Sequence, residues 1–164
     1  MIVELKATLK ETVKLGGNVL IQARDAFTGR LLWEQNPHNR VPLVGRNLIC
    51  AVLAGDTALQ SQPPSHVAIG TGSSSPSDTD IQLGNEVYRS VITQRSLSAS
   101  AITYKFFVPA TAANGYNLSE ACIVNSSGLV PVMPMLSRVT YTPFLKTANI
   151  TVTYTWTHTI SQST

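Results

Sequence analysis

Bulky residues and threonines alternate without a break along residues 149–160, which read NITVTYTWTHTI. This repeat predicts a β-strand with two unlike faces, because successive side chains of a strand point to opposite sides. One face carries large residues such as Tyr154 and Trp156, and the other carries threonines such as Thr153 and Thr155. We therefore predict a strand that packs its bulky face into a core and leaves a ladder of hydroxyl groups outside.

Shorter strand-like runs follow one another along most of the chain. They lie at residues 18–23, 30–34, 66–69, 87–94, 101–108, 118–124, 130–135 and 138–142. A tight turn is expected at 25–29, where Asp25 and Gly29 suit a reversal, and a second turn at 96–100 would join 87–94 to 101–108 as a hairpin. Many short strands with turns about every 8 to 12 residues predict a mainly β single domain over residues 1–164, either an antiparallel β-sandwich or a jelly-roll-like fold.

One segment breaks the two-residue repeat. Residues 45–54 place their leucine, isoleucine and valine side chains at helical spacing, and Gly55 follows them. This pattern predicts one short α-helix at about 45–54 that ends at the glycine.

The first 15 residues, MIVELKATLKETVKL, fit two patterns equally well. Val3, Leu5, Ala7 and Leu9 suit a strand, whereas all the apolar residues together suit a loose amphipathic helix, and periodicity leaves both open. Residues 1–15 are also compatible with an N-terminal arm that becomes ordered on assembly.

Composition and charge exclude several classes of protein. Apolar residues make up 43% of the 164 residues and charged ones 13%, which indicates a folded chain with part of its surface covered by partner chains. The net charge of +3 comes from 12 basic and 9 acidic residues without a basic cluster, which argues against specific nucleic-acid binding. No run approaches the roughly 20 apolar residues of a membrane span, and no export signal is evident. We expect a soluble chain that contacts no membrane and is made without export.

Motifs for catalysis, cofactors or metals are absent from the sequence. Cys50 and Cys122 lie far apart and are expected to be buried, and His38, His66 and His158 stand outside any metal-binding or triad motif. His158 lies on the bulky face of residues 149–160, which predicts an interior or interface histidine. We therefore expect no enzymatic activity, no cofactor and no metal.

Three weaker patterns have plainer interpretations. The glycines at 70–72 resemble a phosphate-binding loop, but no Lys-Ser/Thr pair and no long helix follow them, so a flexible surface loop is favoured. The carboxylate pairs Asp78/Asp80 and Glu86/Glu120 could suggest glycosidase chemistry, but the first pair is better read as loop and helix-start residues. The aromatic residues could line a sugar groove, but their dispersion favours core and interface positions: Trp33, Tyr88, Tyr104, Tyr116, Tyr141, Tyr154 and Trp156.

Four segments taken together resemble small tailed-bacteriophage virion proteins. Residues 66–72, HVAIGTG, followed by 83–89, LGNEVYR, resemble an "AVGTG … LxNExxR" pattern. Residues 118–125, LSEACIVN, with Gly128, resemble "ITEAGLFN … G", and residues 138–147, RVTYTPFLKT, with the last strand, resemble "RxxFxPxxKT … LTVTWTI". The helix entry VGRNL and its closing LAG also fit. The chain departs from the pattern at Glu120-Ala-Cys-Ile-Val and in the Met- and Pro-rich residues 130–135.

The resemblance implies a non-enzymatic structural component of a phage particle, made in the bacterial cytoplasm and located in the virion. We expect a capsid decoration protein that cements the head shell, with the major capsid protein as partner and a homo-oligomer, preferably a trimer, as the assembly. The alternatives are a tail component that contacts tail proteins (a fibre base, baseplate or adaptor subunit) and a carbohydrate- or receptor-binding module.

Six residues are the candidate interface. Glu86 with Arg89, and Glu120 with Arg138, are charged groups expected to lock strand ends or to meet neighbouring chains, and otherwise to form solvent-exposed pairs. Thr153 and Thr155 represent the hydroxyl face, which is expected to contact the particle or, failing that, to be merely solvated.

Overall fold

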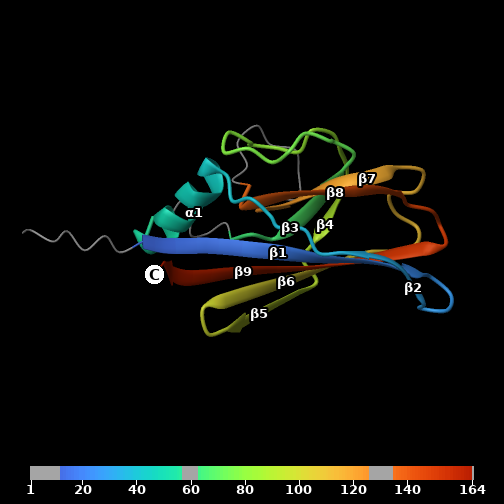
Figure 1. The fold of residues 1–164 in the computed structure, drawn as a ribbon, viewed down its shortest axis with the longest axis horizontal. Helices are drawn as coiled ribbons and strands as arrows, with labels where there is room; N and C mark the ends of the chain where they lie inside the picture. The colour runs from blue at the N-terminus through green and yellow to red at the C-terminus, as the bar shows by residue number, and fades with distance from the viewer. Residues whose placement is uncertain (1–11, 57–62, 126–134, 164) are drawn as a thin grey trace, which may run out of the picture.

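The computed structural model describes residues 12–56, 63–125 and 135–163. Within these residues the chain forms nine strands and one helix, and the strands make two antiparallel sheets. The sheets lie as two layers with a shared hydrophobic core between them (Figure 1). The predicted mainly β, sandwich-type fold with one short helix is confirmed.

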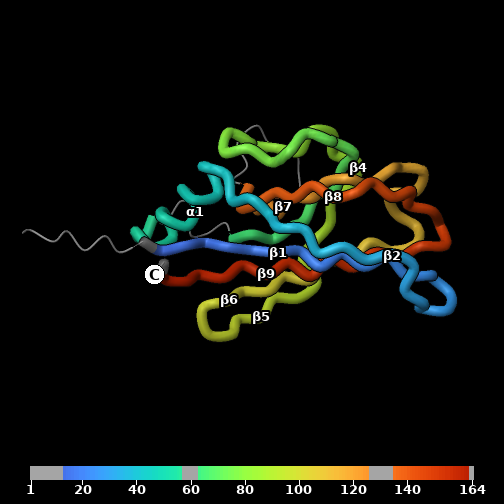
Figure 2. The backbone as a smooth tube through the Cα atoms, viewed as in Figure 1, coloured from blue at the N-terminus to red at the C-terminus, as the bar shows by residue number. Residues whose placement is uncertain are grey.

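The larger sheet is built around a long two-stranded ribbon. β1 and β9 pair along their whole length, from Thr12 opposite Ser163 to Asp25 opposite Ile150, and they run side by side in Figure 2. The sheet order is β2-β1-β9-β6-β5, with bounds β1 Thr12–Asp25, β2 Leu31–Gln35, β5 Gln94–Ser98, β6 Ala101–Val108 and β9 Ile150–Ser163. The turn between β1 and β2 is as predicted, since Asp25 Oδ1 accepts hydrogen bonds from Phe27 N and Thr28 N, and Gly29 has a φ of +71°.

The smaller sheet has four strands in the order β4-β3-β7-β8. Their bounds are β3 His66–Gly70, β4 Glu86–Val91, β7 Asn117–Val124 and β8 Ser137–Leu145. The predicted hairpin between 87–94 and 101–108 is wrong, and so is the turn expected at 96–100, because residues 96–98 belong to a strand. The chain leaves the smaller sheet after Val91, and Gln94–Ser98 then pairs with β6 in the larger sheet. The sequence pattern could not predict this crossing. Alternation of apolar and polar residues identifies a strand, but it does not show which sheet the strand joins.

The core confirms which face of β9 points inward. Val152, Tyr154, Trp156 and His158 are at most 3% exposed, whereas the threonines between them remain half-buried. The Tyr154 hydroxyl also forms a 2.8 Å hydrogen bond with the hydroxyl of Tyr141 on β8, which joins the two sheets through the core.

Two sequence predictions fall partly outside the described residues. Of the N-terminal residues 1–15, Thr12 to Leu15 belong to β1, and residues 1–11, which make up the rest of the expected arm, lie outside the described part. The strand expected at 130–135 also lies outside it except for Met135, which is fully buried.

The predicted helix is confirmed as α1, Leu43–Leu53, with Gly55 at a φ of +74° just beyond its end. It lies at the end of the sandwich where β1 begins (Figure 1). Gly45 is buried against the segment that leads into β8, and a Cβ atom there would overlap the backbone carbonyl oxygen of Leu136. The glycine allows the helix to pack this closely.

Replacing Gly45 by alanine is therefore expected to destabilise the protein. Helix propensity alone would give a gain of about 1 kcal/mol, but the overlap with a rigid backbone is expected to outweigh it, with a net loss of about 1 to 3 kcal/mol. Urea denaturation would measure the change. Gly16→Ala on β1 is the matched control, because its Cβ would meet nothing within 4 Å, and an equal effect of both substitutions would contradict the explanation.

Candidate functional site

The side chain of Glu120 on β7 is the centre of a buried polar cluster. It is 0% exposed, and three backbone N–H groups donate hydrogen bonds to its carboxylate: Gly72 and Asn85 to Oε1, both at 2.8 Å, and Gly84 to Oε2 at 3.0 Å. The donors lie at the two ends of the long loop between β3 and β4. One carboxylate therefore holds both ends of that loop against the sheet.

Arg138 on β8 supplies the positive charge of the cluster. Its Nη2 lies 2.8 Å from Glu120 Oε2, and its Nη1 lies 2.8 Å from Asp80 Oδ2. The guanidinium also donates a hydrogen bond to the carbonyl oxygen of Ser74 at 3.0 Å. Arg138 is 2% exposed, so the cluster connects two strands and the middle of the loop through a buried guanidinium, and of its charged side chains only that of Asp80, 19% exposed, reaches water.

The glycines at 70 and 72 have a packing role. A Cβ atom on Gly70 would overlap the carbonyl oxygen of Asn85 and approach Glu120 Oε1, and one on Gly72 would overlap the Glu120 carboxylate. Glycine is needed because the backbone approaches the carboxylate so closely. The expected flexible surface loop is corrected, since this glycine-rich segment is fixed to a buried anion.

The cluster stabilises the charged forms of its members. Burial alone would raise the pKa of Glu120, but hydrogen bonds from Asn85, Gly84, Arg138 and Gly72 outweigh it and lower the pKa. Burial alone would likewise lower the pKa of Arg138, and its contacts with Asp80 and Glu120 raise it instead. The cluster is therefore an ion pair with a second carboxylate attached.

Two of the candidate interface residues are thus placed inside the protein. Glu120 and Arg138 form the predicted pair, but contact with a neighbouring chain and a solvent-exposed pair are both wrong, because the two side chains are buried. The expected role of Asp80 as a helix-start residue is also wrong, because residues 81–85 form no helix, and its carboxylate pairs with Arg138 instead. The sequence pattern of β7 and β8 could not show that the loop between β3 and β4 covers these two side chains.

Glu86 and Arg89 on β4 form the other predicted pair. The guanidinium contacts both carboxylate oxygens, with Nε 2.8 Å from Oε1 and Nη2 2.6 Å from Oε2. Their side chains are 20% and 8% exposed, so the pair is partly buried along the edge strand of the smaller sheet. Both residues belong to β4, so this bidentate pair spans the irregularity in register between Glu86 and Tyr88, and a contact with a neighbouring chain stays a prediction.

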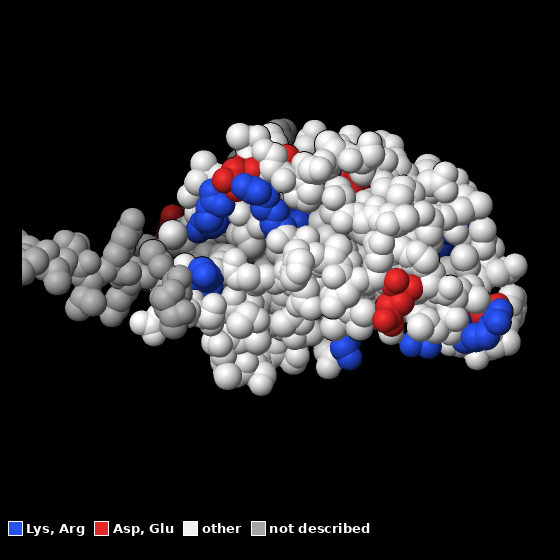
Figure 3. All heavy atoms as spheres, in the orientation of Figure 1, with Lys and Arg blue, Asp and Glu red and all other residues white. Residues whose placement is uncertain are grey.

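Thr153 and Thr155 lie on the outer face of the larger sheet. Thr153 stands between Gln22 of β1 and Phe107 of β6, and Thr155 stands between Leu20 and Lys105. In Figure 3, the charged side chains of the visible side lie mainly toward its two ends. The centre of this face therefore carries the hydroxyl groups of the two threonines and the amide of Gln22. Lys105 is the charged residue beside Thr155.

His158 is an interior histidine, as predicted. Its Nε2 lies 3.0 Å from Ser137 Oγ and 3.3 Å from Asn39 Nδ2. Burial lowers the pKa of the imidazole to about 4. Of the aromatic residues considered for sugar binding, Tyr104, Tyr141, Tyr154 and Trp156 are buried in the core, which agrees with the core interpretation.

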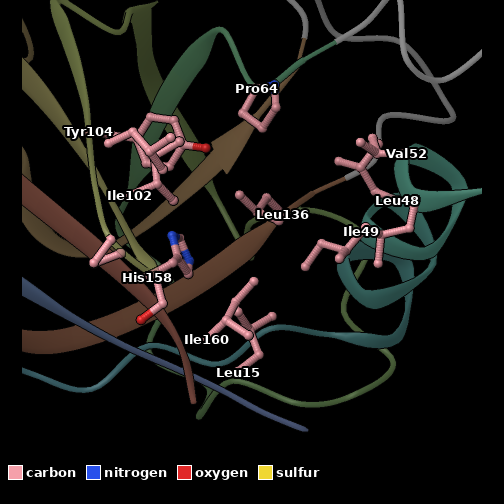
Figure 4. A pocket seen from close by; sticks show the side chains of 15 residues that line it. Leu15, Leu48, Ile49, Val52, Pro64, Ile102, Tyr104, Leu136, His158 and Ile160 are labelled. Atoms are coloured by element: carbon pink, nitrogen blue, oxygen red, sulfur yellow. The ribbon is translucent and has the colours of Figure 1, made fainter. Parts of the chain in front are cut away.

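An apolar groove lies between α1 and the adjoining end of the sandwich. Its volume is about 300 Å³. Leu48, Ile49 and Val52 of α1 face Ile102 and Tyr104 of β6 across it, with Leu136 between them (Figure 4). The remaining residues that line it are Leu15, Leu53, Pro64, Leu97, Ala99, Ser100, Ala101, His158 and Ile160.

Within residues 12–56, 63–125 and 135–163, no three His, Cys, Asp or Glu side chains come together to hold a metal ion. Cys122 is buried as expected, but Cys50 is exposed on α1, so the expectation is wrong for that residue. In the same described part, no helix is long and apolar enough to cross a membrane.

Comparisons with known proteins gave no match. No protein-family model matches the sequence, and neither the curated proteins nor the solved structures contain a significant match to it.

Proposed function

We propose that this chain is a non-enzymatic structural component of a bacteriophage particle, acting as a decoration protein that stabilises the head shell. The observation that carries the proposal is the cluster around Glu120. Gly72, Asn85 and Arg138 belong to three of the segments that resemble phage virion proteins, and all three contact the same carboxylate. The resemblance thus rests on residues that act as one structural unit.

The surface of the larger sheet supports a role in binding another protein. Its outer face is broad, and its central strand presents half-buried threonines in place of charged groups. Desolvating hydroxyl groups costs less than desolvating ions, so such a face can be covered by a partner. A major capsid protein is the proposed partner, and a homotrimer is the proposed assembly.

Copy number tests the proposed location. Quantitative mass spectrometry of purified particles is expected to find hundreds of copies of this chain, because a cement protein occupies the repeated joints of the shell. Six or twelve copies would replace the head assignment with a tail component. Absence of the chain from particles would overturn the virion role.

Charged replacements on the hydroxyl face are expected to block attachment. Thr153→Glu/Thr155→Glu places two carboxylates on the contact surface, and we expect at least a tenfold loss of binding to particles that lack the protein. The measurement is cosedimentation with such particles.

Thr111→Glu/Ser75→Glu is the matched control, because both residues are exposed and lie in loops outside the larger sheet. It adds the same charge and should leave binding unchanged. Unimpaired binding of the Thr153/Thr155 variant, with its circular dichroism spectrum preserved, would show that this face is only solvated.

A further inference from the structure

We propose that residues 1–11 of one copy of this chain bind in the apolar groove of a second copy. The inference rests on the homo-oligomeric part of the proposed function and is independent of the virion role. It names the surface through which copies associate, and it can be tested on the purified protein.

The groove has the properties of an interface rather than of a closed core. Apolar side chains at its rim face solvent: Leu53 is 82% exposed, Leu97 78% and Ile160 48%. Among the described residues that line the groove, none carries an acidic or a Lys or Arg side chain, and burial keeps the imidazole of His158 neutral at pH 7. An exposed apolar surface of this kind marks an interaction site, and we assign it to a second copy of this chain.

The sequence of residues 3–10, VELKATLK, is complementary to such a groove. In an extended conformation, successive side chains point to opposite sides. Val3, Leu5, Ala7 and Leu9 would therefore face the groove, while Glu4, Lys6, Thr8 and Lys10 would face water. Burying the first set against the groove removes apolar surface of both copies from water without burying a charge.

The groove lies beside the point where this segment joins the fold. Leu15 of β1 is part of its lining, and residue 11 directly precedes β1. Eleven extended residues span at most about 36 to 40 Å, which is long enough to reach a neighbouring molecule packed against the same end of the sandwich.

The local sequence favours a second copy over the chain's own groove. Binding in its own groove would require the chain to reverse direction immediately before β1. Residues 9–12 are Leu-Lys-Glu-Thr and contain none of the Gly, Pro, Asn or Asp residues that favour tight reversals. A segment that kept the direction of β1 would instead extend away from its own chain, toward another molecule.

Complementation between two full-length variants tests the proposal. The arm variant, Val3→Lys/Leu5→Lys/Leu9→Lys, keeps the groove, and the groove variant, Leu53→Lys/Leu97→Lys, keeps the arm. Each alone is expected to raise the dissociation constant of self-association at least tenfold in sedimentation velocity. Their mixture is expected to recover heteromeric complexes, because the intact arm of one variant meets the intact groove of the other. Lysine in both variants prevents attraction between the altered surfaces.

Phe27→Lys/Leu145→Lys is the matched control, because both side chains are exposed, at 84% and 51%, and neither lines the groove. It should associate like the unaltered chain. The inference is overturned if the unaltered chain stays monomeric at high concentration, if the arm and groove variants associate normally, or if the mixture forms no complexes.

Particle binding separates this inference from the proposed function. A groove variant that stays monomeric and still attaches to particles would support both the inference and the proposed virion role. Normal association of both variants, together with attachment to particles, overturns only the inference, and normal complementation without attachment overturns only the virion role.

Discussion

Replacing Glu120 by glutamine is expected to lower the free energy of unfolding by about 3 to 5 kcal/mol, because it removes the fully buried one of the two carboxylates that contact the guanidinium of Arg138. The glutamine amide also places an N–H₂ group where backbone N–H groups of the loop now donate. The loss is large because neither charge can be solvated by water. Urea denaturation at pH 7 measures it.

Arg40→Leu is the control for this experiment, since it breaks an ion pair with Asp78 that is half exposed. The unfolding midpoint of that variant should stay nearly unchanged. The double variant Glu120→Leu/Arg138→Leu should lose less stability than the sum of its two single variants, because it removes both buried charges together. Additive losses would show that the two side chains do not act as a pair.

Acidification is expected to destabilise the protein between about pH 6.5 and pH 4 through His158. Burial lowers the pKa of this imidazole from 6.5 to about 4 in the folded state. Between these two values the unfolded state binds the proton and the folded state does not, so the free energy of unfolding rises with pH and falls on acidification. The difference corresponds to about 3 kcal/mol. Urea denaturation from pH 4 to pH 8 would measure the slope.

His158→Gln should remove most of that slope while retaining a polar side chain near Ser137. His66, whose pKa is lowered by burial and by Arg89, would account for the remainder. The carboxylate of Glu120 acts in a lower range: its folded pKa lies below 4.5, so its contribution is present above pH 4.5 and is lost as the pH falls through the folded value. An unchanged slope in the His158 variant would disprove the assignment.

Most of the strands were predictable because each is a local pattern, whereas β5 covers residues 94–98, where a turn was expected from residue 96. The alternation along 149–160 places Tyr154, Trp156 and His158 inward, and the structure confirms it. The helix was equally local, with apolar residues at helical spacing and Gly55 after its last turn. The crossing between β4 and β5 was not predictable, because it depends on which partner strand each segment meets.

The candidate site was predictable only in part. Glu120 and Arg138 were recognisable as a pair from the motifs that contain them, but no local pattern indicated that they are buried. Their burial depends on the loop between β3 and β4, which places Gly72, Gly84 and Asp80 over the smaller sheet. Gly72 and Gly84 could be noticed in the sequence. Their role, which is to let the backbone approach the carboxylate of Glu120, is seen only in the folded structure.

The sequence by itself determined the two-faced strands, the short helix and the scarcity of charge, because these follow from the chemistry of neighbouring residues. Only the tertiary structure decided where a buried charge could be tolerated and where an apolar surface stays open. Glu120 and Arg138 are stable in the interior because loop and strands from distant parts of the chain converge on them. The groove likewise brings together Leu15, Leu97 and Leu136, which only the folded chain places side by side.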